Sequence, residues 1–182
     1  MACVHRGGSG SAVWLGQDGL FGGEEEERRA FSKIVRLAAS RELCASRARQ
    51  RLARDGFDGD AAERAVRRAC ACGLIDDRRY ADAFVRSRLA QGRGRTGIER
   101  ELASCAIDVA DLPGWPDEYF PVEGLDEAQR AYECVARNPP RSKNPQAAAC
   151  RKLLARGFSY DAAFAAARRY ARDCQEDPRG HF

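Results

Sequence analysis

Leu52-Ala-Arg-Asp-Gly56-Phe57 is the stretch that decides the fold, because its pattern returns twice further along the chain. Leu102-Ala-Ser-Cys-Ala106-Ile107 has alanine in the glycine position, and Leu153-Leu-Ala-Arg-Gly157-Phe158 has glycine again. Each stretch is typical of a helix that ends in a left-handed turn, and Asp58, Asp108 and Ser159 follow as caps for the next helix. The three leucines lie 50 and 51 residues apart. A period near fifty residues predicts stacked helical units that bury one another's apolar faces.

Ala, Leu and Arg dominate the chain from about residue 30 onward, and β-branched residues are sparse, which favours helix. We therefore expect an all-α protein in which tandem three-helix bundles form an elongated, curved chain. Pro113 and Pro116 interrupt the middle bundle, so its last helix should be short. The expected divisions are a tail over residues 1–27 with a small hairpin turn at Gln17-Asp18-Gly19, repeats over residues 28–73, 74–122 and 123–176, and a tail over residues 177–182.

Charge is distributed unevenly along the chain. Residues 28–100 carry 19 basic and 9 acidic residues, whereas residues 101–139 carry 2 basic and 9 acidic residues. A basic first half indicates a polyanionic partner such as nucleic acid, although a solvated helical surface would look the same in the sequence.

Several classes of function find no support in the residue pattern. The sequence has no G-x-S-x-G, no P-loop and no plausible Cys/His dyad, so we expect no enzyme, no cofactor and no metal. The eight cysteines are scattered, which favours small, buried, reduced thiols. A thiol-dependent enzyme using Cys70 or Cys72 is a distant alternative. No run of apolar residues is long enough to span a membrane and no signal peptide is evident, so a cytoplasmic protein is expected.

Residues 73–88 read Gly-Leu-Ile-Asp-Asp-Arg-Arg-Tyr-Ala-Asp-Ala-Phe-Val-Arg-Ser-Arg, which strongly resembles the signature of the RecX family, the regulators of the RecA recombinase. The resemblance continues through Gly92-Arg-Gly94 and Ile98-x-x-Glu101-Leu102, and it covers roughly residues 30–173. The chain departs from the family pattern at Gly97, where a basic residue is usual, and at Cys105-Ala106-Ile107, where Lys-Gly-Ile is common.

This resemblance implies a regulator that binds RecA, mainly as its filament on single-stranded DNA, and inhibits its recombinase, ATPase and coprotease activities. It also implies weak non-specific contact with DNA, no membrane partner and a monomer. The alternative is a stand-alone helical module that binds nucleic acid without RecA.

The motif residues divide into structural and contacting groups. Asp76 and Asp77 are interpreted as a helix cap and a first-turn partner of the helix dipole, in preference to a paired-carboxylate site. The structural group comprises Gly73, Leu74, Ile75, Asp76, Asp77, Tyr80, Phe84 and Val85. Arginine presents a planar fork that suits phosphates and carboxylates. The candidates for contact with RecA or DNA are therefore Arg64, Arg67, Arg68, Arg78, Arg79, Arg86, Arg88, Arg93 and Arg95.

Overall fold

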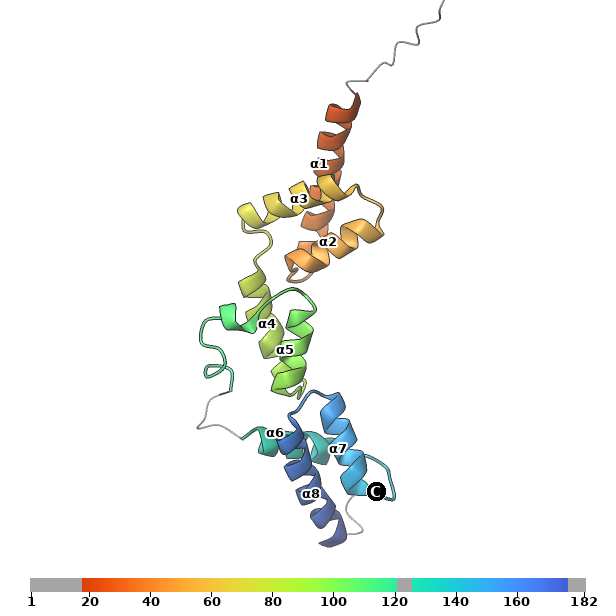
Figure 1. Cartoon of the computed structure of the whole chain (residues 1–182), viewed down its shortest axis with the longest axis vertical. Helices are drawn as coiled ribbons and strands as arrows, with labels where there is room; N and C mark the ends of the chain where they lie inside the picture. The colour runs from red at the N-terminus through yellow and green to blue at the C-terminus, as the bar shows by residue number, and fades with distance from the viewer. Residues whose placement is uncertain (1–17, 121–125, 177–182) are drawn as a thin grey trace, which may run out of the picture.

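A computed structural model describes residues 18–120 and 126–176, and within them every regular element is a helix. The elements follow one another along a long axis (Figure 1), which confirms the expected all-α, elongated chain. They are α1 (Asp18–Ala38), α2 (Ala45–Arg54), α3 (Gly59–Ala71), α4 (Asp77–Ala90), α5 (Arg95–Ala103), the 3₁₀ helix η1 (Val109–Asp111), α6 (Glu127–Arg137), α7 (Pro145–Ala155) and α8 (Tyr160–Glu176). None of the helices in the described ranges is both long and apolar enough to cross a membrane.

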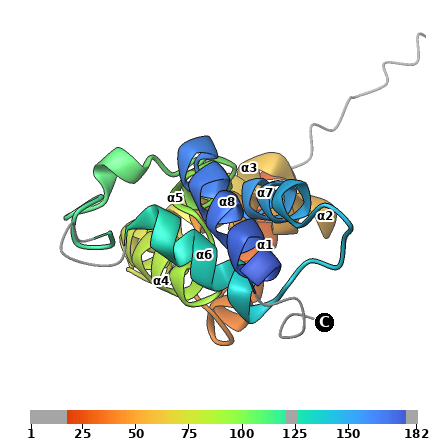
Figure 2. The same cartoon turned by 90° about the horizontal axis from the view of Figure 1, so that it is seen from below.

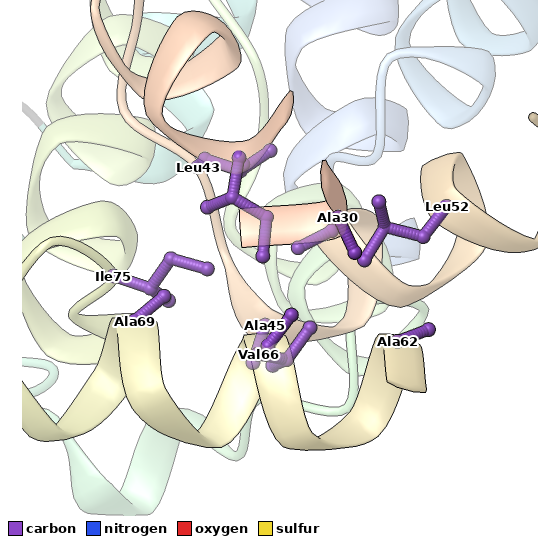
Figure 3. Close-up of a cluster of buried hydrophobic side chains, with 11 residues drawn as sticks. Ala30, Leu43, Ala45, Leu52, Ala62, Val66, Ala69 and Ile75 are labelled. Atoms are coloured by element: carbon purple, nitrogen blue, oxygen red, sulfur yellow. The ribbon is translucent and has the colours of Figure 1, made fainter. Parts of the chain in front are cut away.

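The core is divided into separate clusters that succeed one another along the axis. The first cluster lies between α1, α2 and α3, where side chains such as Leu43, Leu52 and Val66 gather among small alanines (Figure 3). A second cluster lies around α4 and α5, and a third among α6, α7 and α8. Seen along the long axis, the helices of the third unit overlie those of the first two (Figure 2). Each unit therefore depends on its neighbours only at the junctions between clusters.

The repeated turns have the same geometry in all three units. Leu52, Leu102 and Leu153 are fully buried, and the carbonyl oxygen of each accepts a hydrogen bond from the amide five residues later. The residue in the glycine position has a positive φ in each turn: 82° at Gly56, 57° at Ala106 and 82° at Gly157. An alanine in this region is strained by about 1–2 kcal/mol. The side chains of Asp58, Asp108 and Ser159 then cap the following helix.

The second unit has only the short η1 where the other units have a third helix. The segment after η1 packs aromatic side chains against α4 instead. Tyr119 is buried, its hydroxyl donates a hydrogen bond to Asp82 at 2.7 Å, and its ring packs beside Trp115. Aromatic side chains therefore complete the second cluster in place of a helix.

The expected tail over residues 1–27 is wrong for residues 18–27, because α1 begins at Asp18. Gln17 of the expected hairpin turn lies outside the described part of the chain, and Asp18 and Gly19 belong to α1. Contacts with α3 explain the early start: Arg64 donates to the Glu27 carboxylate and to the Gly23 carbonyl oxygen, and Glu26 accepts the Asp58 amide. These tertiary contacts outweigh the low helix propensity of the glycines.

Carboxylates from one unit cap the second helix of the unit before it. Asp77, the first residue of α4, accepts the Ala45 amide at the start of α2 at 2.8 Å. Glu127, the first residue of α6, accepts the Arg95 amide at the start of α5 at 3.3 Å. The two donors, Ala45 and Arg95, lie one repeat length apart, and so do the two acceptors, Asp77 and Glu127. The same contact therefore joins the first unit to the second and the second unit to the third.

Candidate functional site

The motif of residues 73–88 lies at the junction between the first and second units. Gly73 has a φ of +71° in the turn after α3, and Leu74 and Ile75 pack against the first cluster. Tyr80, Phe84 and Val85 belong to α4 and pack in the second cluster. The motif thus spans the boundary between the first and second hydrophobic clusters.

The two adjacent carboxylates of the motif serve different helices. Asp76 accepts hydrogen bonds from the Arg79 and Arg78 amides, and these bonds hold the pKa of its carboxyl below the ordinary value. Asp77 accepts the Ala45 amide of the previous unit. Because each carboxylate accepts from its own amide groups, Asp76 and Asp77 act as two separate helix caps and do not form one paired-carboxylate site.

Most of the nine arginines singled out from the sequence already have partners within the chain. Arg64, Arg79, Arg86, Arg88, Arg93 and Arg95 pair with carboxylates, and the guanidinium of Arg68 lies over the Phe31 ring. Among the described residues, neither Arg67 nor Arg78 has an ion pair or ring partner, and both are exposed. Exposed ion pairs are worth little, so a polyanion can compete for the paired arginines as well.

A strongly basic groove lies between the first and second units, with a volume of about 760 Å³. We call it the first-junction groove. Its walls come from the end of α1, the length of α2, one face of α4 and the turn after α5. Five arginines line it (Arg41, Arg47, Arg51, Arg54 and Arg88) together with one carboxylate, Glu42, which pairs with Arg79. The excess of positive charge in one concavity suits a chain of phosphates.

Arg41 and Arg54 are the two groove arginines most available to a ligand. Both are exposed, and neither has an ion pair or ring partner within residues 18–120 and 126–176. The sequence interpretation missed all of the groove arginines except Arg88. A signal was present, since Arg47, Arg51 and Arg54 recur at helical spacing along α2 and therefore share one face.

A cluster of thiol, phenol and guanidinium groups lies beside the groove. Arg47 Nε donates a hydrogen bond to Cys105 Sγ at 3.4 Å, and the Arg47 guanidinium also lies 5.9 Å from the centre of the Tyr80 ring. Cys105, Tyr80 and Arg47 line the groove, whereas Cys44 is fully buried in the same cluster. Burial raises the pKa of Tyr80 to about 12 and that of Cys44 to about 11.

The second junction also has a cavity, of about 800 Å³, but the arginines that line it are nearly matched in number by carboxylates. Arg95, Arg130, Arg137 and Arg156 line it together with Asp126, Glu127 and Glu133. The Arg130 guanidinium donates to the Arg93 carbonyl oxygen, so it is committed to joining the units. The first-junction groove is therefore the better candidate for a polyanion.

Cys70 and Cys72, the thiols considered from the sequence, lie exposed at the end of α3. Although Cys70 is exposed, partial desolvation of its sulfur, and then the negative charge of Asp77, raise the pKa of this thiol. A raised pKa disfavours a reactive thiolate at this position. Within the described residues, no three His, Cys, Asp or Glu side chains come together in a way that could hold a metal ion.

A row of helical units with a basic groove at one junction has a shape and charge that suit an extended, negatively charged partner. A family model described as "RecX, second three-helix domain" matches residues 76–110, which contain α4, α5 and the first two residues of η1. Regulatory protein RecX of Halorhodospira halophila is 32% identical over 150 residues, which cover 80% of this chain and 91% of the relative. Regulatory protein RecX of Chromohalobacter salexigens is 32% identical over 141 residues, covering 75% and 89%.

The chain belongs to the RecX family, and its role is regulatory. Solved structures share its fold. A crystal structure of regulatory protein RecX aligns over 86% of this chain and 76% of its own, with a TM-score of 0.60 and 18% identity. The crystal structure of RecX from Lactobacillus salivarius aligns over 81% and 97%, with a TM-score of 0.57 and 17% identity.

Proposed function

We propose that this protein binds the RecA recombinase, mainly as its filament on single-stranded DNA, and inhibits its recombinase, ATPase and coprotease activities. The observation that carries the proposal is the match to regulatory proteins RecX along nine tenths of a relative's length. Inhibition needs no chemistry, because a ligand that prefers one state of a filament shifts the equilibrium toward it. The protein would act as a cytoplasmic monomer.

The first-junction groove would receive the phosphates of the DNA strand. Its arginines lie in the loop between α1 and α2, on α2 and on α4, so they can follow a strand that crosses from one unit to the next. Hydrogen bonds and ion pairs from guanidinium groups to phosphates do not depend on the identity of the bases, so contact with DNA should be independent of its sequence.

The test combines RecA, single-stranded DNA and increasing amounts of the protein, and it follows ATP hydrolysis and filament length. The wild-type protein should slow hydrolysis and shorten filaments at a few-fold molar excess, and no effect there would refute the proposal. The double variant Arg41→Ala/Arg54→Ala should inhibit less strongly. Its matched control, Arg151→Ala/Arg172→Ala, removes the same charge from two exposed arginines of α7 and α8, away from the groove, and should inhibit almost as well as the wild type.

A stand-alone nucleic-acid-binding module is the second candidate, because the unpaired Arg41 and Arg54 need no RecA to meet a phosphate. This candidate predicts tight binding to single-stranded DNA alone, with affinity that falls steeply with salt. If the double groove variant removes two phosphate contacts, its salt slope should be shallower by about 1.4, since each contact contributes about 0.7 on a single strand. Binding that appears only when RecA is present would exclude this candidate.

A further inference from the structure

Two cysteines from different units meet beside the first-junction groove. Cys105 follows α5 in the second unit and lines the groove, and only 3% of its surface is exposed. Cys44 precedes α2 in the first unit and lies fully buried within the same side-chain cluster. Arg47, three residues after Cys44, donates a hydrogen bond to the Cys105 sulfur, and both cysteines belong to the second cluster, so the two thiols lie close together across the junction.

The two thiols have opposite electrostatic surroundings. Burial alone would raise the pKa of Cys105, but the hydrogen bond and charge of Arg47 outweigh it, helped by hydrogen bonds from Cys44 and Tyr80, and the pKa is lowered. The pKa of Cys44 is raised to about 11, chiefly by burial. The groove-facing sulfur is therefore the more acidic of the pair and ionises more readily than the sulfur behind it. A lowered pKa and a neighbouring second cysteine are properties of oxidation-sensing sites, and the place of Cys105 in the groove wall gives a small peroxide a route to the sulfur.

We propose that Cys105 is a redox-sensitive thiol that reduces a hydroperoxide entering through the first-junction groove, and that Cys44 resolves the product as a disulfide joining the first and second units. In the first step the Cys105 thiolate attacks the peroxide oxygen and becomes a sulfenic acid, and the leaving alkoxide or hydroxide takes up a proton. In the second step the Cys44 sulfur attacks the sulfenic sulfur, forms the disulfide and releases water. The sum is two thiols and one hydroperoxide giving one disulfide, one alcohol (water, for hydrogen peroxide) and one water.

Oxidation would also change the charge of the groove, an effect that rests on the proposed function. Because a disulfide sulfur cannot ionise, oxidation removes the anionic form that Cys105 can present to Arg47, and this guanidinium becomes more available to a phosphate. We expect the oxidised protein to bind single-stranded DNA a few-fold more tightly than the reduced protein. Its salt slope should be steeper by about 0.7, the contribution of one added contact on a single strand.

The chemical step is tested by mass spectrometry on the full-length chain carrying Cys70→Ser and Cys72→Ser, which removes the exposed thiols of α3. The reduced protein is treated with hydrogen peroxide, denatured in an alkylating agent and digested with trypsin. The expected product links residues 42–47, which contain Cys44, to residues 101–130, which contain Cys105. A reducing agent should reverse the link, and Cys44→Ser should leave Cys105 as a sulfenic acid that dimedone traps. A Cys105 that stays free, or is oxidised without ever linking to Cys44, would overturn the proposal.

The role of Arg47 separates a reactive site from two buried thiols that merely pack together. Arg47→Ala should slow the oxidation of Cys105 several-fold, whereas Arg54→Ala removes the same charge from α2 without touching a thiol and should leave the rate unchanged. Equal rates in the two variants would count against the site. The linked peptide is measured without RecA or DNA, so failure of the proposed function cannot be mistaken for failure of the thiol chemistry. Unchanged DNA affinity in the linked protein would refute the effect on the groove.

Discussion

Replacing Gly97 with alanine tests how the second and third units are joined. Gly97 is the third residue of α5, and its amide donates a hydrogen bond to the Gly157 carbonyl oxygen at 2.9 Å. A β-carbon on Gly97 would lie 2.8 Å from the Gly157 Cα atom and 3.1 Å from the Arg156 carbonyl oxygen. Both neighbours are backbone atoms and cannot rotate away, so the two units must separate slightly to admit the methyl group.

Two opposing effects set the size of the change. Within a helix, alanine is more favourable than glycine by about 0.5–1 kcal/mol. Overpacking against the backbone costs about 1–3 kcal/mol, and weakening the hydrogen bond to Gly157 costs a further 0.5–1.5 kcal/mol or so. We therefore expect Gly97→Ala to lower the free energy of unfolding by about 1–3 kcal/mol, the opposite sign to its helix propensity.

The measurement is urea-induced unfolding followed by far-ultraviolet circular dichroism. Gly59→Ala is the matched control, since Gly59 begins α3 and an added β-carbon there has no atom within 4 Å. The control should be as stable as the wild type or more stable by up to about 1 kcal/mol. If Gly97→Ala unfolds at the same urea concentration as the wild type, or at a higher one, the close backbone contact does not hold these units together.

Three further predictions follow from single contacts. Asp77→Ala removes the cap of α2 and should cost about 1 kcal/mol, and up to about 2 kcal/mol, in urea unfolding, whereas Asp60→Ala, which removes a first-turn carboxylate without a side-chain partner, should cost less. Leu102→Ala empties a fully buried position in the second cluster and should cost about 2–5 kcal/mol by the same measurement. Hydrogen bonds from Arg86 and then Tyr119 lower the pKa of Asp82 in the folded protein. The ionised Asp82 therefore stabilises the fold at neutral pH, and this stabilisation is lost as the pH falls below about 4, the pKa of Asp in the unfolded chain. Thermal unfolding should therefore show Asp82→Asn to be less stable than the wild type at pH 7, with the difference shrinking on acidification, and a difference that does not depend on pH would contradict this assignment.

Local signals explain the part of the fold that the sequence predicts. The turns after Leu52, Leu102 and Leu153 need only a buried leucine, a left-handed residue and a following cap, and all of these lie within a few neighbouring positions. The start of α1 could not be predicted in this way. It depends on Arg64, a residue of another helix, which bonds to Gly23 and Glu27.

The candidate site was only partly predictable for the same reason. Basic character is a property of composition, so the sequence alone could predict that the first half of the chain binds a polyanion. Which arginines remain unpaired depends on the carboxylates that folding brings near them, as Glu42 comes near Arg79. Arg41 and Arg54 become the most available cations of the groove only because no such carboxylate reaches them within the described residues.

The two junctions differ because two repeat positions hold different residues. Arg47 and Gly97 are equivalent, as are Cys105 and Arg156. At the second junction the glycine lets backbones meet, and the Gly94 and Gly97 amides bond to the Arg156 and Gly157 carbonyl oxygens. At the first junction, where residues 44–47 and 105–107 are all described, no backbone bond joins the equivalent segments, and the long Arg47 side chain reaches the Cys105 sulfur instead. The departure from the family pattern at Gly97 thus accompanies a direct backbone contact between the second and third units, and the arginine in the same position accompanies the basic groove of the first junction.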